Sequence, residues 1–421
     1  MASSNNTPRI VELAAQISAS VNKFETLLSD QGLPSPTFDE DSPPSFPDDM
    51  YSLRAQILDA TAELNEVLTE PLMLIFKFAA ISNLISLDTV CRLGILDMVP
   101  AGGKLSFAEV AGKTGLSHAE VRRVLRHAMA MRVLQEPEPE MVAHTKVSKF
   151  MSLPHIQAWA QFEGKDTWPA CAKVADALEK WPASGDIKET GFALANNGKS
   201  VFEVLHADPE RAMRFGSGMK SLDHVPGCGD MLVSKAYDWA SLGNSHIVHV
   251  GGSRGVVAMD LAKHFEKTRF LVQDGPMMIK GAEVPEELQG RVDFMEHELF
   301  APQTVQADVY YFRMAFRNWN DENAVKLLKA QVPALRRGAK LLIQDKCMTP
   351  PNTVPISEER IQRAIDMSLK TFFNSRDRYL DDWKALLAAA DEKFVLHKVV
   401  QIEGSLLSML EVHWDVSSVK A

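Results

Sequence analysis

Apolar residues recur at helical spacing along the first third of the chain. Over residues 8–31 the apolar positions fall every three or four residues, which predicts an amphipathic helix whose apolar stripe needs a partner. Residues 33–50 are rich in proline and acid and show no periodicity, so they predict a linker. Two more apolar helices are expected over residues 51–100, the second of them over residues 79–99.

The pattern changes to two short helices and a turn-rich segment over residues 105–150. The first helix, in LSFAEVAGKTG, ends at a glycine, and the second begins at the N-cap Ser117 with Glu120 three residues later. The following EPEPEMVAHTKVSKFM predicts a small β-wing, so the segment is expected to be a winged helix. It could bind DNA through Arg122, Arg123 and Arg126, or it could serve dimerisation or cover a substrate. The acidic chain favours the second alternative.

A mostly helical stretch follows to residue 240, and β-rich runs then alternate with helical segments. The runs that predict strands are HIVHV, RFLVQD, VDFMEHELF, ADVYYFRM, KLLIQDK and SLLSMLEVHWDV. This alternation predicts an α/β, Rossmann-like, doubly wound and mostly parallel sheet, with a last antiparallel strand at its edge. The expected domains are an N-terminal helix (1–32), a linker (33–50), a helical and winged-helix-like domain (51–155), a helical connecting region (156–240) and a Rossmann-like domain (241–421).

Composition restricts the class of protein and its location. The 421 residues are 46% hydrophobic and carry a net charge of -10, which fits a soluble globular protein and argues against a nucleic-acid binder. Four cysteines lie far apart without a CxxC pair, which argues against a disulfide framework or a zinc site and for a reducing, cytoplasmic location. No secretory signal is expected, and no apolar run is expected to reach the length of a membrane span, because LMLIFKFAAISNLI is interrupted by Lys77, Ser82 and Asn83.

A glycine-rich turn between a strand and a helix predicts a cofactor site. Gly251, Gly252 and Gly255 in HVGGSRG allow a sharp turn and the close approach of a ligand. The next strand ends at Asp274, where an acid can bind two ribose hydroxyls. The pattern indicates a nucleoside-bearing cofactor without separating NAD from S-adenosylmethionine, and the glycines could instead serve close packing alone.

The later segments, in their order, resemble a known family. HVGGSRG, QDGP, HELF, FRNWNDE and PALRRGAKLLIQD, with VAHTKVS in the N-terminal half, are similar to motifs of the class I S-adenosylmethionine-dependent O-methyltransferases of plant and fungal secondary metabolism. The resemblance covers about residues 50–415 and implies S-adenosylmethionine as the cofactor. It implies that the cofactor-binding residues are Gly251, Gly252, Gly255, Asp274, Glu298 and Arg313. His249 and Ser253 depart from the pattern, where the family has an acid and a glycine.

The catalytic histidine of that family is missing. In relatives this histidine takes a proton from the substrate hydroxyl, a task that suits imidazole. Its position here is Arg317, which stays protonated and cannot act as a base. Asn318 stands where the family has an aspartate, so we expect Arg317 to keep a positive charge that no neighbouring carboxylate neutralises. Arg317 could then stabilise negative charge on a substrate oxygen, as an oxyanion hole does.

This pattern resembles the leporin-type, S-adenosylmethionine-dependent pericyclases of fungal 2-pyridone alkaloid biosynthesis, which have an O-methyltransferase fold. The resemblance implies catalytic roles for Arg317 and His144, and Lys346 in QDK is a further candidate. It also implies a substrate site lined by Phe215, Met219, Leu222 and Asn318. Alternatives remain for each of them: Arg317 in a salt bridge, His144 capping its turn, Lys346 in solvent, and the helix of Phe215 in the core. Asp377 is interpreted as structural.

Three functions remain open from the sequence. The first is a pericyclase that dehydrates its substrate and closes a ring by a hetero-Diels–Alder or Alder-ene reaction, holding S-adenosylmethionine without consuming it. The second is an O-methyltransferase for a phenolic or hydroxypyridone acceptor, and the third is a non-catalytic partner subunit. A small-molecule substrate and a homodimer formed through the N-terminal helices are expected, with no metal, nucleic acid or membrane. The sequence does not identify the substrate or the stereochemistry.

Overall fold

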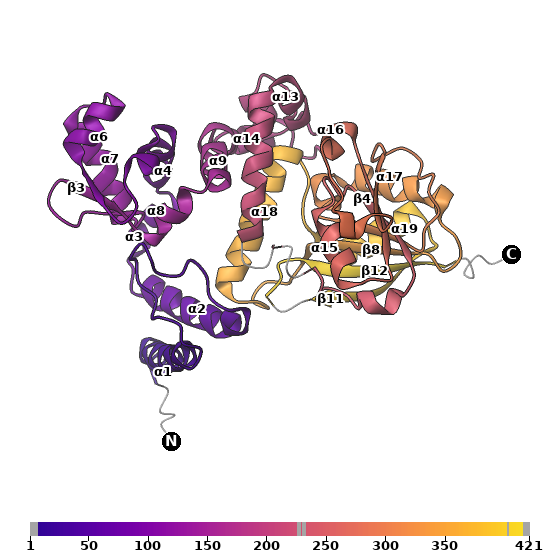
Figure 1. Cartoon of the computed structure of the whole chain (residues 1–421), viewed down its shortest axis with the longest axis horizontal. Helices are drawn as coiled ribbons and strands as arrows, with labels where there is room; N and C mark the ends of the chain where they lie inside the picture. The colour runs from indigo at the N-terminus through magenta and orange to yellow at the C-terminus, as the bar shows by residue number, and fades with distance from the viewer. Residues whose placement is uncertain (1–6, 225–228, 230–232, 402–403, 416–421) are drawn as a thin grey trace. The chain divides into compact units, whose positions relative to one another are not determined.

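The computed structural model describes residues 7–224, 229, 233–401 and 404–415 of the chain (Figure 1). The chain divides into two compact units. Unit 1 comprises Met1–Pro169, Leu205–Ser221 and Pro355–Glu359, and unit 2 comprises Ala170–Val204, Leu222–Val354 and Arg360–Ala421. The domain boundaries expected from the sequence stay predictions. Of the four cysteines, Cys228 lies outside the described residues.

Unit 1 begins with the predicted amphipathic helix, α1 (Arg9–Asp30), which is confirmed. Its buried residues Leu13, Phe24 and Leu28 lie at helical spacing, and Phe24 packs edge-on against Phe46 with ring centroids 5.3 Å apart. Residues 33–47 of the expected linker form no helix or strand, and its end forms the 3-10 helix η1 (Asp48–Met50). This segment is nevertheless packed within unit 1, because the Gly102 N–H donates a hydrogen bond of 2.8 Å to the Glu40 carboxylate.

Residues 51–100 form four helices, which corrects the expectation of two: α2 (Tyr51–Val67), α3 (Pro71–Phe78), α4 (Ser82–Arg92) and α5 (Ile95–Met98). Proline lacks the N–H that would continue a helix, so Pro71 begins a new one. Gly94 separates α4 from α5 in a left-handed conformation, with φ of 64°. The segment Pro71–Arg92 is 22 residues long and, by length and composition alone, apolar enough to cross a membrane. The expectation that no segment reaches that length is therefore wrong.

The winged-helix pattern is confirmed. Its elements are β1 (Lys104–Ser106), α6 (Phe107–Thr114), α7 (His118–Ala130), β2 (Leu134–Gln135) and β3 (Met141–His144), and the strands form an antiparallel sheet in the order β1-β3-β2. Ser117 caps α7 by accepting a hydrogen bond from the Glu120 N–H. The three arginines of the DNA-binding alternative each form a salt bridge with a glutamate: Arg122 with Glu140, Arg123 with Glu120 and Arg126 with Glu136.

The stretch after the wing is helical, as predicted. Its elements are α8 (Lys146–Met151), α9 (Pro154–Phe162), the π-helix η2 (Glu163–Thr167), α10 (Trp168–Cys171), α11 (Val174–Lys180), α12 (Gly191–Ala195), α13 (Val201–Ala207), α14 (Pro209–Met219), η3 (Lys220–His224) and η5 (Trp239–Leu242). Within unit 1, α9 packs against α14, and the buried Asp166 of η2 forms ion pairs with Arg211 and Arg214 of α14.

Unit 2 contains a seven-stranded sheet in the order β11-β12-β8-β7-β4-β5-β6. Its strands are β4 (His246–Val250), β5 (Arg269–Asp274), β6 (Val292–Glu296), β7 (Val309–Arg313), β8 (Lys340–Asp345), β11 (Phe394–Gln401) and β12 (Ser408–Trp414). The strands β4 to β8 pair in parallel, and β12 pairs antiparallel with β8. The predicted Rossmann-like fold is confirmed. The last strand is antiparallel but not at the edge, since β11, which the sequence analysis missed, pairs outside it.

Helices cover both faces of this sheet. α17 (Asp321–Gln331) and α19 (Leu380–Ala390) pack on one face, and α15 (Val256–His264) packs on the other. The remaining elements after β4 are α16 (Pro276–Ile279), η6 (Glu286–Leu288), η7 (Phe316–Asn318), η8 (Val332–Ala334), α18 (Ile356–Phe373) and the short parallel strands β9 (Cys347–Met348) and β10 (Arg378–Tyr379). The sequence analysis also missed α18. Along β7, Tyr310 and Phe312 pack in a core with α17 and α19, whereas Val309 and Tyr311 pack in a second core with α15. This alternation across a strand is what a doubly wound sheet requires.

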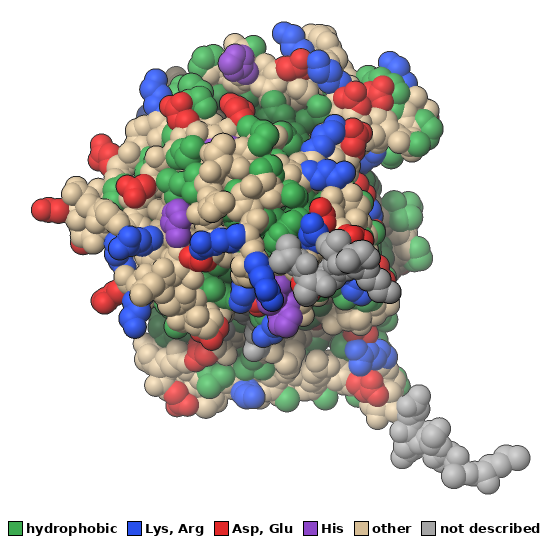
Figure 2. Space-filling model, turned by 90° about the vertical axis from the view of Figure 1, so that its right-hand side faces the viewer, with side chains coloured by type: hydrophobic (Ala, Val, Ile, Leu, Met, Phe, Trp, Pro, Cys, Tyr) green, Lys and Arg blue, Asp and Glu red, His purple; other side chains and the backbone are tan. Residues whose placement is uncertain are grey.

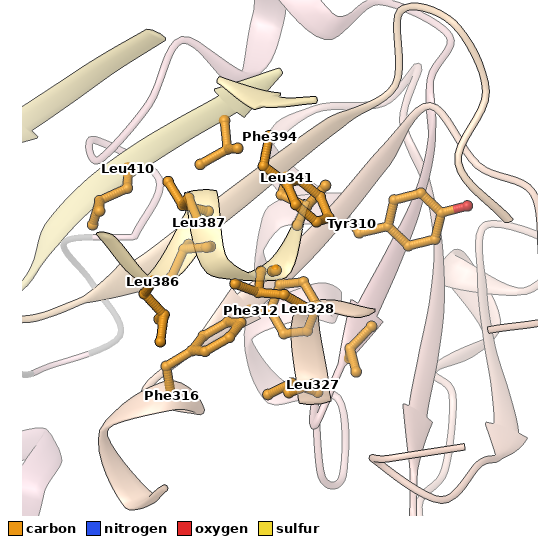
Figure 3. Close-up of a cluster of buried hydrophobic side chains, with 14 of the residues drawn as sticks. Tyr310, Phe312, Phe316, Leu327, Leu328, Leu341, Leu386, Leu387, Phe394 and Leu410 are labelled. Atoms are coloured by element: carbon orange, nitrogen blue, oxygen red, sulfur yellow. The ribbon is translucent and has the colours of Figure 1, made fainter. Parts of the chain in front are cut away.

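The core under β7 fixes the turn that follows it. Figure 3 shows Phe312 and Phe316 directed into the same cluster as Leu327, Leu328 and Leu386. The ring of Phe316 lies 5.1 Å from that of Phe312 and 5.7 Å from that of Trp383. The first residue of η7 is therefore anchored in the core, which determines where the next residue, Arg317, can lie.

The face of the molecule drawn in Figure 2 carries both signs of charge. On the face drawn in Figure 2, acidic and basic side chains are interspersed with apolar ones, and neither sign forms a broad area of its own. This arrangement agrees with the pairing of arginine and glutamate in the winged helix.

Candidate active site

The parallel strands of unit 2 bring most of the predicted site residues to one edge of the sheet. β4 lies between β5 and β7, and β7 pairs with β8. The glycine turn, Asp274, Arg313, Arg317 and Lys346 all lie at or directly after the carboxyl ends of these strands. In open α/β sheets this edge is where ligands bind.

The three glycines of the turn after β4 have different reasons to be glycine. A Cβ on Gly252 would lie 2.7 Å from Val272 Cγ1, and one on Gly255 would lie 2.7 Å from Phe294 Cζ, so the protein's own packing excludes a side chain at both. Gly251 has φ of 74°, and its Cβ position has no atom within 4 Å. Close packing thus explains Gly252 and Gly255, and Gly251 is where the turn leaves open space.

Asp274 is held in place by the backbone around it. Its Oδ2 accepts a hydrogen bond from the Ser253 N–H and its Oδ1 accepts one from the Gly275 N–H, both of 2.8 Å. Each oxygen keeps a further lone pair, which suits the two hydroxyls of a ribose. Burial raises the pKa of Asp274, and the nearby charge of Glu298, an exposed side chain, adds to this. The donors and acceptors of this turn therefore fit a nucleoside-bearing cofactor.

His249, at the position where the family has an acid, is neutral and buried. It is 3% exposed, its ring packs 4.7 Å from that of Tyr311, and its Nδ1 has no hydrogen-bond partner among the described residues. Burial, together with the positive charge of Arg313, lowers the pKa of His249 to about 3. The site therefore loses a negative charge at this position without gaining a positive one.

The η7 turn is fixed at its backbone by an acid that the sequence analysis did not assign to the site. Asp345, at the end of β8, is 1% exposed. Its Oδ2 accepts hydrogen bonds from the N–H groups of Phe316 (3.0 Å) and Arg317 (3.2 Å). Its Oδ1 accepts one from the Lys346 N–H (2.9 Å). The backbones of Arg317 and Lys346 are therefore both hydrogen-bonded to this one carboxylate.

The side chain of Arg317 is buried in an ion-pair network. It is 6% exposed, its Nη2 donates a hydrogen bond of 2.7 Å to Asp377 Oδ2, and its Nε lies 4.0 Å from Asp345 Oδ1. The expectation that no carboxylate neutralises Arg317 is therefore wrong. The loss of an acid at Asn318 is offset by Asp377, whose role had been interpreted as structural. Burial raises the pKa of Asp377 to about 6 despite the charge of Arg317.

Asn318 takes part in the turn itself. Its Nδ2 donates a hydrogen bond of 3.2 Å to the Met314 carbonyl. Met314 has φ of 52°, a left-handed conformation that is strained for a side-chain-bearing residue. The predicted contact of Asn318 with the substrate stays a prediction, but the structure gives this residue a role in holding the strained turn.

Lys346 is buried. It is 3% exposed, which contradicts the alternative of a lysine in solvent, and its carbonyl accepts a hydrogen bond from Trp383 Nε1 (3.2 Å). Its neighbour Cys347 has a raised pKa because of burial, although the charge of Lys346 acts in the opposite direction. A buried ammonium one residue beyond Asp345 keeps Lys346 a candidate for the site.

His144 already uses both ring nitrogens inside unit 1. Nδ1 lies 2.9 Å from Ser148 Oγ, and Nε2 lies 3.1 Å from the Val99 carbonyl oxygen. The residue is 5% exposed. These contacts favour the alternative in which His144 holds its own turn, because a catalytic role would require breaking one of them.

The predicted substrate-site residues Phe215, Met219 and Leu222 do not all belong to one unit of the chain. Phe215 and Met219 are half-buried on α14 in unit 1, and Phe215 packs against Phe162 with ring centroids 5.3 Å apart. Leu222 lies in η3 and belongs to unit 2. The predicted substrate site for these residues stays a prediction.

The segment after α18 supplies three residues that bond to the η7 turn, of which the sequence analysis considered only Asp377, and interpreted it as structural. Ser375 Oγ donates to the Arg317 carbonyl (2.6 Å), and Arg378 Nη1 donates to the Phe316 carbonyl (3.1 Å). Asp377 pairs with Arg317. These residues belong to the motif NSRDRY, whose polar character is the only signal in the sequence, since Ser375 and Asp377 precede the short strand β10. Within the described part of the chain, no three His, Cys, Asp or Glu side chains gather as metal ligands.

Two family models match the chain. An O-methyltransferase domain matches residues 184–391. An O-methyltransferase dimerisation domain matches residues 74–152.

Known relatives cover almost the whole chain. O-methyltransferase PaMT of Phomopsis amygdali is 38% identical over 413 residues, which cover 97% of each chain. O-methyltransferase VdtC of Byssochlamys spectabilis is 32% identical, with 95% of this chain and 96% of the relative covered. Among solved structures, OxaC has a TM-score of 0.78 at 20% identity over 96% of this chain and 99% of its own. The complex of LepI with SAM has a TM-score of 0.72 at 20% identity, over 94% and 100%. These structural similarities support the fold.

Proposed function

Because the chain belongs to the O-methyltransferase family, we propose that it binds S-adenosylmethionine at the carboxyl edge of its sheet and is a pericyclase of fungal secondary metabolism. The observation that carries the proposal is the buried Arg317 at the position of the family's catalytic histidine. A guanidinium is protonated at every physiological pH, so this position cannot supply the usual base.

The cofactor site uses residues described above. Asp274 would bind the ribose hydroxyls, Gly251 would allow the methionine part to approach the backbone, and Glu298 and Arg313 would lie toward the adenine. When bound, S-adenosylmethionine would supply a sulfonium positive charge to the site.

Arg317 and Lys346 would act on the substrate as hydrogen-bond donors. Both are buried, and their backbones bond to the same carboxylate of Asp345. Donors fixed in a dry site stabilise negative charge on a carbonyl or enolate oxygen better than donors in water do. Such a site favours the loss of water from an alcohol to give a diene or quinone methide, which then closes by a hetero-Diels–Alder or Alder-ene reaction. The protein would orient the reacting ends.

A second candidate function is methyl transfer to a hydroxyl. It is supported by the names of the relatives, which are O-methyltransferases. It is also supported by Asp377, since a carboxylate whose pKa is about 6 can accept a proton near neutral pH. The chain would then methylate a phenolic or hydroxypyridone oxygen with aspartate in place of histidine.

The test combines mass analysis of the purified protein with turnover. The full chain is incubated with S-adenosylmethionine and a 2-pyridone that carries a secondary alcohol on its side chain. We expect a cyclised product lighter than the substrate by one water, and no S-adenosylhomocysteine. Steady formation of S-adenosylhomocysteine would establish methyl transfer instead. Absence of both products, with tight binding to another pathway enzyme, would favour the non-catalytic subunit.

The role of Arg317 is tested by a matched pair of variants. Arg317→Gln should lower the rate by a factor of about 10²–10³, as the removal of a charge-stabilising donor does. Arg336→Gln is the control, because Arg336 is a half-exposed arginine paired with Asp308. Equal rates for Arg317→Gln and the wild type would contradict the proposed role.

We also propose a homodimer formed through the N-terminal helices. The dimerisation-domain match begins within α3. Large apolar side chains are exposed along α3, α4 and the residue before α4: Leu72, Met73, Ile75, Phe76, Phe78, Ile81 and Ile85. Exposed apolar surface of this extent in a soluble protein marks an interaction site. In sedimentation experiments, Phe76→Glu should shift the protein toward monomer, whereas Met213→Glu, an exposed residue outside the match, should not.

A further inference from the structure

The Arg317–Asp377 ion pair leaves two of its buried polar atoms without hydrogen bonds. Among the described residues, Arg317 Nε and Asp377 Oδ1 have no hydrogen-bond partner. The other Asp377 oxygen accepts the 2.7 Å bond from Arg317 Nη2, and the Asp377 residue is 4% exposed. Nearly all buried polar groups in folded proteins are paired, so an unpaired donor and an unpaired acceptor in one ion pair require an explanation.

A hydroxyl group matches this arrangement. A hydroxyl donates one hydrogen bond and accepts others, so it can donate to Asp377 Oδ1 while its oxygen accepts from Arg317. We infer that the Arg317–Asp377 pair receives an acidic hydroxyl of the substrate, a phenol or an enol, and that its proton passes to Asp377 Oδ1. This inference rests on the proposed function in placing the substrate at Arg317, and it makes Asp377 a catalytic residue.

The transfer conserves charge within the pair. The substrate O–H bond breaks, its electron pair stays on the oxygen, and a new O–H bond forms at Asp377 Oδ1. The negative charge thereby moves from the carboxylate to the substrate oxygen. Arg317, no longer neutralised by Asp377, then faces this new negative charge. The oxyanion is the reactive form for either candidate function, since it can expel a leaving hydroxyl elsewhere in the molecule or attack an electrophile.

The charges around Asp377 prepare it to accept a proton. Asp345 on β8 and Asp366 on α18 contribute negative charge, while Arg317 on η7 contributes positive charge. The Asp377 N–H also donates a hydrogen bond of 2.7 Å to Asp366 Oδ1. Burial is the largest cause of the raised pKa of Asp377, which is about 6. This value is closer to the pKa of an acidic phenol than the pKa of a solvent-exposed aspartate is. At neutral pH the group is still mostly ionised and can act as the acceptor.

The experiment uses para-nitrophenol, whose anion absorbs visible light, as the probe for the full-length chain. The pH is set between the pKa of Asp377 and that of the free phenol. The wild type should show the phenolate band on binding. Calorimetry in buffers of different ionisation enthalpy should show no net release of protons, because the proton stays on Asp377. In Asp377→Asn the band should disappear, or should appear only with the release of one proton per ligand to the buffer.

Controls separate this result from altered folding. Asp308→Asn changes a surface carboxylate paired with Arg336 and should behave as the wild type does. Asp377→Glu keeps a carboxyl group and should restore the band. Para-nitroanisole, which has no acidic proton, should bind without proton exchange in every variant. In the wild type and in Asp308→Asn, the band should fade as the pH falls below about 6, because Asp377 is then already protonated.

Three results would overturn the inference. They are a phenolate band that is unchanged in Asp377→Asn, a wild-type band that releases one proton to the buffer, and the absence of the band from the wild type. The probe has no leaving hydroxyl and needs no methyl donor. If the pericyclase proposal fails, the proton transfer to Asp377 can still be observed with this probe. If the proton transfer is not observed, the pericyclase proposal is still tested separately by its own product.

Discussion

Two neighbouring positions near the carboxyl edge of the sheet depart from the family pattern, one by the loss of an acid and the other by the loss of a base. In β4, His249 stands in place of an acid, and after the paired strand β7, Arg317 stands in place of a histidine. His249 is buried and neutral, and no described residue bonds to its Nδ1. Arg317 is equally buried but lies between Asp345 and Asp377 and keeps its charge.

The difference reflects both the group and its surroundings, because imidazole titrates near neutral pH whereas guanidinium stays protonated. Removing a group from water disfavours its charged form, and only a partner of opposite charge or a set of hydrogen bonds offsets this cost. Arg317 has carboxylate partners, whereas His249 Nδ1 has no hydrogen-bond partner among the described residues. The site therefore has a neutral buried ring in β4 and a buried ion pair after β7.

The largest effect is expected from removing Asp345. Asp345→Ala removes an acceptor for three backbone N–H groups and a neighbouring charge of Arg317. Breaking a buried ion pair by deleting one partner costs about 3–5 kcal/mol of unfolding free energy. Urea denaturation measures the loss. Asp308→Ala is the control, because its pair with Arg336 is half-exposed and such pairs contribute about 0–1 kcal/mol. Equal losses would contradict the role given to Asp345.

In the glycine turn, the next effect comes from added side chains. Gly255→Ala places a Cβ in a left-handed residue 2.7 Å from Phe294 Cζ. We expect a loss of about 3 kcal/mol, combining the left-handed strain and the overpacking. Gly251→Ala meets open space and should cost only the strain, about 1–2 kcal/mol. Thermal or urea denaturation compares the two. A larger loss in Gly251→Ala would mean that its open side is packed in solution.

His249 and Asp377 should change the free energy of unfolding in opposite directions as the pH falls. The pKa of His249 is lowered to about 3, so between about pH 6.5 and 3 the unfolded chain binds a proton that the folded chain does not, and stability falls on acidification. The pKa of Asp377 is raised to about 6, so between about pH 6 and 4 the folded chain binds the extra proton, and stability rises on acidification.

Two variants separate these contributions. Relative to the wild type, His249→Phe should gain about 1.4 kcal/mol of stability per pH unit of acidification below pH ~6.5. Asp377→Asn should lose stability relative to the wild type over the window from pH ~6 to ~4, by at most a similar slope. Urea titrations at several pH values measure both. Parallel curves for wild type and His249→Phe would show that this histidine is protonated in the fold.

The smallest effect is expected at Asn318. Asn318→Ala removes one hydrogen bond to the Met314 carbonyl and should cost about 1 kcal/mol. Because the bond supports the strained residue before η7, the rate should fall more than the stability does. Comparing denaturation with turnover tests this. A loss of stability with no change in rate would show that the turn does not need the bond to position Arg317.

The periodicity of the sequence predicted most of the fold. The segments HIVHV and RFLVQD coincide with β4 and β5, and the winged helix and α1 were also found where expected. The strand β11 was missed although FVLHKVVQ is rich in β-branched residues, because its buried and exposed positions do not alternate cleanly at the sheet edge. The helix α18 was missed although Ile361, Ile365, Leu369 and Phe372 are spaced as on one helical face.

The chemistry of the site was predicted only in part. The spacing located Arg317, Lys346 and Asp274 at strand ends, and the sheet brings those ends to one edge. The pairing of Arg317 with Asp377 spans 60 residues of chain. No local pattern connects two residues at that separation. The prediction used only the adjacent Asn318, and it therefore wrongly left Arg317 without a carboxylate partner.

The sequence by itself determined the family, the doubly wound sheet and the absence of a histidine where relatives have their base. These properties follow from residue identity and from local periodicity, both of which can be read along the chain. Only the tertiary structure decided that His249 is neutral, that Arg317 is ion-paired and that one oxygen of Asp377 has no hydrogen bond from the described residues. These properties depend on burial and on which distant groups come together, because electrostatic interactions act through space and not along the chain.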